Sequence, residues 1–225
     1  MTALILVRHG ESEWNFLNQF TGWTDVGLTE NGIQEAQFAA EKILQEKILI
    51  NTIYTSVLLR STHTAEIIAD TIGFDTKNIK YNWRLNERHY GALTGLNKDE
   101  MKKIYGEKKI HEFRRSWDTS PDPLSRNNPY HPVNIDVYKD IPLENIPDTE
   151  SLKDTYDRVL PYFKKEIQNK GLTKIKSYDF SYILTKKFFR EAKKNNILNK
   201  PFKFNKPIIL IHGLKDDVVS HKMPQ

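Results

Sequence analysis

The chain has 225 residues, a length typical of one domain with a single sizeable core, and its lack of cysteine excludes disulfides and thiolate metal sites and favours the cytoplasm. The formal net charge of +5 is unevenly spread, because residues 1 to 163 carry 19 basic and 24 acidic side chains whereas residues 164 to 225 carry 15 and 5. The basic residues of the second part are scattered and match no nucleic-acid-binding motif, so we expect a solvated surface and no nucleic-acid partner.

The first half of the chain alternates strand and helix patterns. The apolar run Ala3 to Val7 predicts a buried strand, since it is too short for a secretory or membrane-spanning segment. A helix should begin after Thr29 and present one apolar face, formed by Ile33, Ala36, Ala40, Ile43 and Leu44. A second strand, Thr52 to Ser56, precedes a helix that should end at Gly73 and whose apolar face is Ala65, Ile68, Ala69 and Ile72. This alternation predicts an α/β fold.

The second half begins with an irregular segment. Between Ser120 and Glu150 the chain carries six prolines and no sustained periodicity, which predicts a long surface loop of the kind that often forms a lid or binding segment. Helical spacing returns from Leu152 to Ile167, and Gly171 should end that helix.

A histidine directly follows the first predicted strand, in the sequence Arg-His-Gly-Glu-Ser-Glu-Trp-Asn at residues 8 to 15. Ligands gather at the carboxyl ends of strands in open α/β sheets. A neutral imidazole can attack phosphorus if its other ring nitrogen is fixed as a donor, which makes His9 a candidate nucleophile. Arg8 offers a planar charged fork for phosphoryl oxygens, and Gly10 would let backbone amides approach them. The competing interpretation is a histidine that is merely packed at a strand end.

Three segments together resemble the cofactor-dependent phosphoglycerate mutases of the histidine phosphatase superfamily. They are residues 8 to 15 followed by Phe-Thr-Gly-Trp-Thr-Asp at 20 to 25, residues 54 to 64 around Arg60, and residues 85 to 98. The resemblance implies a three-layer sandwich whose mostly parallel sheet is flanked by helices. It also implies interconversion of 2- and 3-phosphoglycerate in glycolysis and gluconeogenesis, with 2,3-bisphosphoglycerate as phosphoryl primer and no metal, since arginines and backbone amides can neutralise the phosphoryl charge.

The resemblance also assigns roles to residues. His9 carries the phosphoryl group, Glu87 is the general acid/base, and Arg60 clamps the transferring group, whereas His63 is structural. The expected substrate contacts are Arg8, Gly10, Glu11, Ser12, Glu13, Trp14, Asn15, Thr21, Gly22, Arg60, Arg88, His89, Tyr90, Lys98, Arg114 and Arg115. The expected partners are small phosphorylated three-carbon acids, with no membrane partner, and a homodimer stays open.

The resemblance covers residues 1 to about 168, which we expect to form the catalytic domain, and residues 169 to 225 form an atypical tail. The tail lacks the family's His-Gly-Asn-Ser motif and instead resembles an α/β-hydrolase fragment with Asp216 as the triad acid. A hydrolase triad cannot form here, because Gly-x-Ser-x-Gly is absent and His221 follows Asp216 too closely. An open alternative is that the run ending at His212 takes the missing strand's place and puts His212 beside His9.

Two rival functions therefore stay open beside the mutase. One is a phosphatase of the same superfamily, against which the residue 87 to 98 motif argues. The other is a degenerate fusion protein with little or no catalysis, because the tail departs from the family pattern.

Overall fold

A computed structural model of the protein describes residues 3–168, 173–177 and 180–184. The described residues divide into two compact units. The larger is His9–Leu160, and the smaller combines the described parts of residues 3–8 and 161–184. The candidate site lies in the larger unit, apart from Arg8. In the described part of the chain no helix is both long and apolar enough to cross a membrane.

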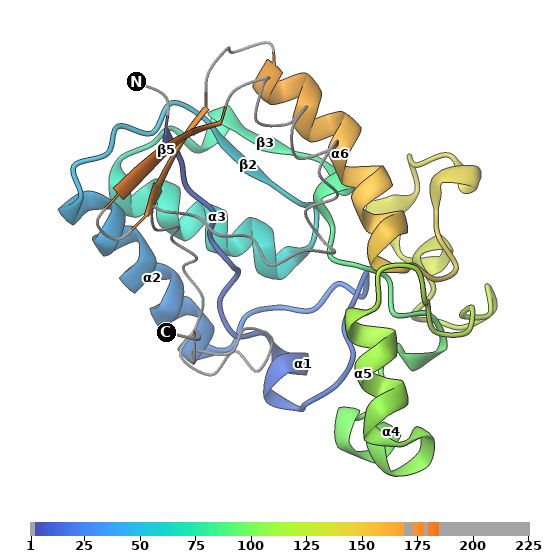
Figure 1. The fold of residues 1–225 in the computed structure, drawn as a ribbon. Coiled ribbons are helices and arrows are strands. Elements are labelled where there is room, and N and C mark those ends of the chain that lie inside the picture. Colours follow the sequence, from blue (N-terminus) through green and yellow to red (C-terminus); the bar gives the residue numbers. More distant parts are fainter. Residues whose placement is uncertain (1–2, 169–172, 178–179, 185–225) are drawn as a thin grey trace. The chain divides into compact units, whose positions relative to one another are not determined.

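The larger unit contains a strand–helix–strand motif. Strand β2 (Ile53–Thr55) pairs in parallel with β3 (Ile79–Tyr81), with Ile53 opposite Ile79. Helix α3 (Leu59–Ile72) connects them and packs against both β2 and helix α2 (Glu30–Gln45), as Figure 1 shows. A parallel pair joined by a helical crossover is the basic unit of α/β folds, so the predicted fold class is confirmed.

The ends of these two helices follow the sequence signals. The hydroxyl of Thr29 accepts a hydrogen bond from the amide of Gly32 and caps α2 as predicted. Gly73 ends α3 in the left-handed conformation, at a φ of 69°. One part of the predicted apolar face of α2 is wrong, because Leu44 is 48% exposed and Ala39 is buried in its place. Small alanines let α2 approach α3 closely, so the buried stripe follows them.

Three more helices, besides α2 and α3, precede the long irregular segment. Helix α1 (Glu13–Phe16) is a single turn, and α4 (Lys98–Tyr105) and α5 (Glu107–Arg115) lie side by side in Figure 1. Helices α4 and α5 share a small core with residues outside them, and its members are Phe20, Leu93, Met101, Ile110 and Phe113. Gly106 joins α4 to α5 with a positive φ of 81°, which a glycine adopts without strain.

The proline-rich segment differs from the predicted surface loop. It has no α-helix or strand, as expected, but it forms three short 3-10 turns, at Pro132–Asn134, Asp136–Tyr138 and Leu143–Asn145. It also contributes core residues, since Tyr138, Ile141 and Ile146 are buried in one cluster with Trp23 and Leu58. Its apolar residues are too irregularly spaced to reveal this burial in the sequence.

The smaller unit holds a three-stranded sheet. Strand β1 (Ala3–Leu4) pairs in parallel with β4 (Thr173–Ser177), which pairs antiparallel with β5 (Phe180–Leu184). Strand β1 is shorter than the predicted Ala3 to Val7. Helix α6 (Leu152–Gln168) contributes to both units and begins where predicted, whereas Gly171 lies outside the described residues. His212, Asp216 and His221 also lie outside them, so the domain division at residue 168 stays a prediction.

Candidate active site

His9 starts the larger unit, and its loop is held by two hydrogen bonds. Nδ1 of His9 lies 2.6 Å from the carbonyl oxygen of Gly10, and the amide of Gly10 donates to the hydroxyl of Thr64 over 3.2 Å. Because a carbonyl can only accept, Nδ1 carries the hydrogen, and the lone pair of the neutral ring is on Nε2. This is the tautomer in which Nε2 can act as a nucleophile.

Gly10 is required by the packing of this loop. A Cβ atom on Gly10 would overlap the carbonyl of Gly32, and one on Gly32 would overlap the carbonyl of Glu11. The two glycines therefore let the loop after His9 run against the first turn of α2. The approach that the structure describes is to Gly32, and the predicted approach of backbone amides to a phosphoryl group stays a prediction.

The predicted contacts at residues 11 to 15 hold the loop and α1 in place. Ser12 caps α1 in a reciprocal capping box with Asn15. The Glu11 carboxylate accepts from the Thr29 hydroxyl over 2.9 Å, and the Trp14 ring meets the Tyr130 ring edge-on at 5.1 Å. Glu13 is exposed. Direct substrate contacts by these residues stay predictions.

Arg60 joins three of the predicted site segments. Its side chain is fully buried, and it donates to the carbonyls of Gly22 over 2.7 Å and Thr24 over 2.9 Å. The same guanidinium pairs with a carboxylate oxygen of Glu87 at 2.9 Å. One turn along α3, Thr64 donates to the carbonyl of Arg60 and accepts from Gly10. The structure thus connects the loop of His9, the residue 21 to 24 segment and the Glu87 side chain, to which the resemblance assigns proton transfer.

A second cluster follows Glu87 directly. Nη2 of Arg88 donates to the carbonyl of Arg114 over 2.7 Å, and the Arg88 guanidinium lies 5.0 Å from the centre of the Tyr90 ring. Nε and Nη1 of Arg88 are buried, and they have no hydrogen-bond partner within the described part of the chain. Buried donors normally bind a partner, so these two are suited to an anionic ligand. Burial raises the pKa of Tyr90, which keeps its phenol protonated.

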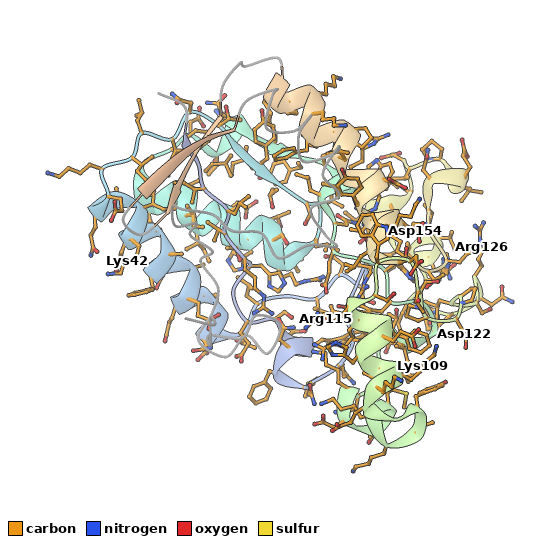
Figure 2. All side chains as sticks on the ribbon, viewed as in Figure 1. Lys42, Lys109, Arg115, Asp122, Arg126 and Asp154 are labelled. Carbon is orange, nitrogen blue, oxygen red and sulfur yellow. The ribbon has the colours of Figure 1, made fainter. Side chains whose placement is uncertain are left out.

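Three more basic residues predicted for the site, Lys98, Arg114 and Arg115, lie on α4 and α5. Lys98 opens α4, and its amide donates to the carbonyl of Asn18 over 2.8 Å. Figure 2 shows Arg115 at the end of α5, where its Nη1 donates to the carbonyl of Arg114 over 3.3 Å. Arg8 belongs to the smaller unit, so its part in the site stays a prediction.

His89 is buried in the core rather than displayed on a surface. Its Nδ1 accepts from the amide of Gly91 over 2.9 Å, and its ring lies 6.4 Å from that of Trp23 and 6.0 Å from that of His131. Burial and the neighbouring His131 lower the pKa of His89 to about 3, with Arg158 adding to the shift and Asp148 opposing it. The ring is therefore neutral in the folded protein, and its predicted substrate contact stays untested by this geometry.

We expect this buried ring to make stability depend on pH. Between pH 6.5 and about 3 the unfolded state binds a proton at His89 that the folded state does not, so the free energy of unfolding should fall as pH falls through this window. The variant His89→Asn keeps an acceptor for Gly91 but cannot be charged. Urea unfolding of this variant should therefore show a smaller decrease in the free energy of unfolding between pH 6.5 and 4.5 than wild type shows. Some decrease should remain, because burial also lowers the pKa of His131.

The matched control is His111→Asn, at an exposed position of α5. Its free energy of unfolding should change with pH as it does in the wild-type protein. The same dependence on pH in His89→Asn and in wild type would show that another group causes the acid sensitivity.

Comparison with known proteins identifies the family to which the chain belongs. The profile of the histidine phosphatase superfamily (branch 1) matches residues 4–131. A 2,3-bisphosphoglycerate-dependent phosphoglycerate mutase of Pelagibacter ubique (strain HTCC1062) is 63% identical over 170 residues, 76% of this chain and 71% of the relative. The chain belongs to the phosphoglycerate mutase family of this superfamily. A second such mutase, from Hydrogenobaculum sp. (strain Y04AAS1), is 39% identical over 215 residues, 94% of this chain and 87% of the relative.

Solved structures also share the fold of this phosphoglycerate mutase family member. A mycobacterial glucosyl-3-phosphoglycerate phosphatase matches with a TM-score of 0.54 at 21% identity, over 72% of this chain and 63% of its own. A protein described as mycobacterial hydrolase 1 matches with the same TM-score and identity, over 72% and 64%. At this identity the likeness concerns the fold alone.

Sequence reasoning missed three residues that hold the site together. Thr64 lies four residues after Arg60, a spacing that places both on one face of α3, and this signal was available. Glu150 lies just before α6 and Arg158 eight residues further on, and nothing in their local sequence indicates that they bind the backbone on either side of Glu87. Within the described residues, no group of three or more His, Asp or Glu side chains could hold a metal ion.

Replacement of Arg60 tests the connection that it makes. We expect Arg60→Ala to lower the free energy of unfolding by about 2 to 4 kcal/mol, because it leaves the carbonyls of Gly22 and Thr24 without their donor. The loss of the pair with Glu87 adds little, since that side chain is 37% exposed. Urea unfolding measures this. If Arg60 and Arg8 also bind the phosphoryl group, Arg60→Ala and Arg8→Ala should both weaken inorganic phosphate binding.

The control for both measurements is Arg126→Ala. Arg126 pairs with Asp148, and the two side chains are 50% and 38% exposed, so their pair should contribute at most about 1 kcal/mol. Equal effects of the three substitutions on phosphate binding would contradict the predicted clamp.

Proposed function

We propose that the protein interconverts 2-phosphoglycerate and 3-phosphoglycerate by transferring a phosphoryl group through His9, primed by 2,3-bisphosphoglycerate. The observation that carries the proposal is the Arg60–Glu87 pair at 2.9 Å, joined to the His9 loop through Thr64. It brings a phosphate-binding cation and a proton-transferring carboxylate into the framework that holds the nucleophile. The names of the two mutases described above support the same reaction and the same primer.

The chemistry assigned to each residue follows from this arrangement. Nε2 of His9 attacks the phosphorus of 2,3-bisphosphoglycerate, an N–P bond forms, and the bond from phosphorus to the glycerate oxygen breaks. The Glu87 carboxylate takes the proton of the hydroxyl that attacks the phosphohistidine, and it returns this proton to the leaving glycerate oxygen when His9 is phosphorylated again. Arg60 and the two unused donors of Arg88 offer charge-assisted hydrogen bonds to the phosphoryl and carboxylate oxygens.

A coupled assay tests the proposal and its rival together. Purified protein is given 3-phosphoglycerate with and without 2,3-bisphosphoglycerate, and both 2-phosphoglycerate and inorganic phosphate are measured. A mutase gives 2-phosphoglycerate that depends on the bisphosphate, with little inorganic phosphate. Release of inorganic phosphate without isomerisation would favour a phosphatase, a function carried by a relative of the same fold. Neither product would indicate a degenerate protein.

The wider setting follows as part of the proposal. The reaction would belong to glycolysis and gluconeogenesis, its substrates are small phosphorylated three-carbon acids, and no step needs a metal. A cytoplasmic location and a homodimer stay predictions from the sequence.

A further inference from the structure

Arg158 and Glu150 form a buried ion pair that no site prediction includes. Nε of Arg158 donates to one carboxylate oxygen of Glu150 over 2.7 Å and Nη2 donates to the other over 2.9 Å. The two side chains are only 8% and 3% exposed. A capping box between Ser151 and Asp154, which Figure 2 labels, fixes the start of α6 directly after Glu150.

The rest of the Arg158 guanidinium binds the backbone that leads to Glu87. Nη1 donates to the carbonyls of Arg84 over 2.9 Å and Asn86 over 3.1 Å, with a longer contact of 3.4 Å to that of Trp83. Nη2 also donates to the carbonyl of Glu87 over 3.3 Å. One side chain therefore binds four carbonyls in a stretch of five residues.

Glu150 holds the other side of the same stretch. Its carboxylate accepts from the amide of His89 over 2.9 Å, and its own amide donates to the carbonyl of His89 over 3.1 Å. The backbone is thus fixed both before and after Glu87 and Arg88. The Arg158 guanidinium also lies 5.1 Å from the centre of the Trp23 ring, and Trp23 stands between the two residues whose carbonyls bind Arg60.

Stability alone does not account for this arrangement. A buried ion pair gains little over apolar residues of similar volume, because both charges lose their hydration. What the pair provides, and apolar residues could not, is a set of directed bonds to the backbone around Glu87. The Glu87 side chain then makes its own bond to Arg60, whose place is set from α3.

We propose that Arg158, oriented by Glu150, is a positioning residue that holds the backbone of residues 83 to 89 so that the Glu87 carboxylate is placed for proton transfer. This inference rests on the proposed function of Glu87. Arg158 touches no reacting atom, and it acts through the carbonyls of Arg84, Asn86 and Glu87.

The test separates positioning from folding by replacing both members of the pair. The double variant Glu150→Met/Arg158→Met removes both buried charges, so it should fold, but it cannot bind the carbonyls. We expect its kcat for phosphoglycerate to fall by about 10²-fold, the cost of a small misplacement, with a much smaller change in KM. Arg158→Lys, which retains the charge and one donor group, should lie between it and wild type.

A second background shows whether Arg158 acts through Glu87. In a protein that already carries Glu87→Gln, the double methionine substitution should cost no more than about threefold further in kcat, because the positioned carboxylate is gone. A merely structural role would reduce kcat by the same factor in both backgrounds. Arg126→Met is the control, since it removes an arginine from an exposed pair with Asp148 and should leave kcat unchanged.

Amide exchange provides a readout that does not depend on activity. In Arg158→Lys, which keeps Glu150 and therefore the acceptor of the His89 amide, exchange should be faster at the amides of Asn86 and His89, both of which are hydrogen-bonded in the intact protein. Unchanged exchange there, or a double variant with wild-type kcat, overturns the inference. A wild-type protein that is inactive on phosphoglycerate would refute the proposed function, and the exchange measurement would then decide the inference alone.

Discussion

Incubation of the protein with 2,3-bisphosphoglycerate is expected to label His9, and His9→Ala is expected to abolish both this label and turnover. The physical reason is the hydrogen bond from Nδ1 of His9 to the carbonyl of Gly10, which puts the lone pair of the neutral ring on Nε2. No other group could replace a nucleophile that forms the covalent intermediate. Mass spectrometry under conditions that preserve acid-labile phosphohistidine identifies the labelled residue, and the coupled assay measures turnover.

The control is His111→Ala, at an exposed position of α5, which should be labelled and active like wild type. Thermal melting of both variants confirms that the loss in His9→Ala is chemical rather than a failure to fold. A label on His63, on α3, or on the buried His89 would refute the assignment of the nucleophile.

The elements with strong local signals could be predicted from the sequence. Thr29 and Gly73 identify the start of α2 and the end of α3, because capping depends on a few neighbouring residues. Helices α4 and α5 received no prediction, since they are short, strongly charged and have only three buried apolar residues between them, Met101, Ile110 and Phe113. Their burial depends on Phe20 and Leu93, which are distant in sequence.

In the candidate site, too, the roles of residues could be predicted from local sequence, whereas contacts between distant segments could not. The residue types at Arg60 and Glu87 could be assigned from a family resemblance, but their direct pairing could not, because 27 positions separate them. The role of Gly10 also needed the structure, which shows that its missing side chain makes room for Gly32. Arg158 was not predicted at all, because it binds backbone carbonyls. Every residue type carries a backbone carbonyl, so the sequence of residues 83 to 87 does not indicate that an arginine binds there.

Replacement of Glu87 by glutamine should slow turnover by about 10² to 10⁴-fold, the contribution typical of a general acid/base. Glutamine has nearly the same shape and can still accept a hydrogen bond from Arg60 through its amide oxygen, so the framework around Gly22 and Thr24 should persist. What is lost is the group that gives a proton to the leaving oxygen and removes one from the attacking hydroxyl. The coupled assay measures kcat, and urea unfolding should show only a small change in stability.

The matched control is Glu112→Gln on α5, which also removes a carboxylate from an ion pair, here with Lys109 at 3.1 Å. Both members of that pair are nearly half exposed, so the substitution should leave kcat unchanged and alter stability by less than about 1 kcal/mol. If Glu87→Gln retains more than a tenth of wild-type kcat, another group transfers the proton, and the pair with Arg60 is then a structural contact only. If Glu112→Gln slows turnover as strongly, the loss does not report on proton transfer at Glu87.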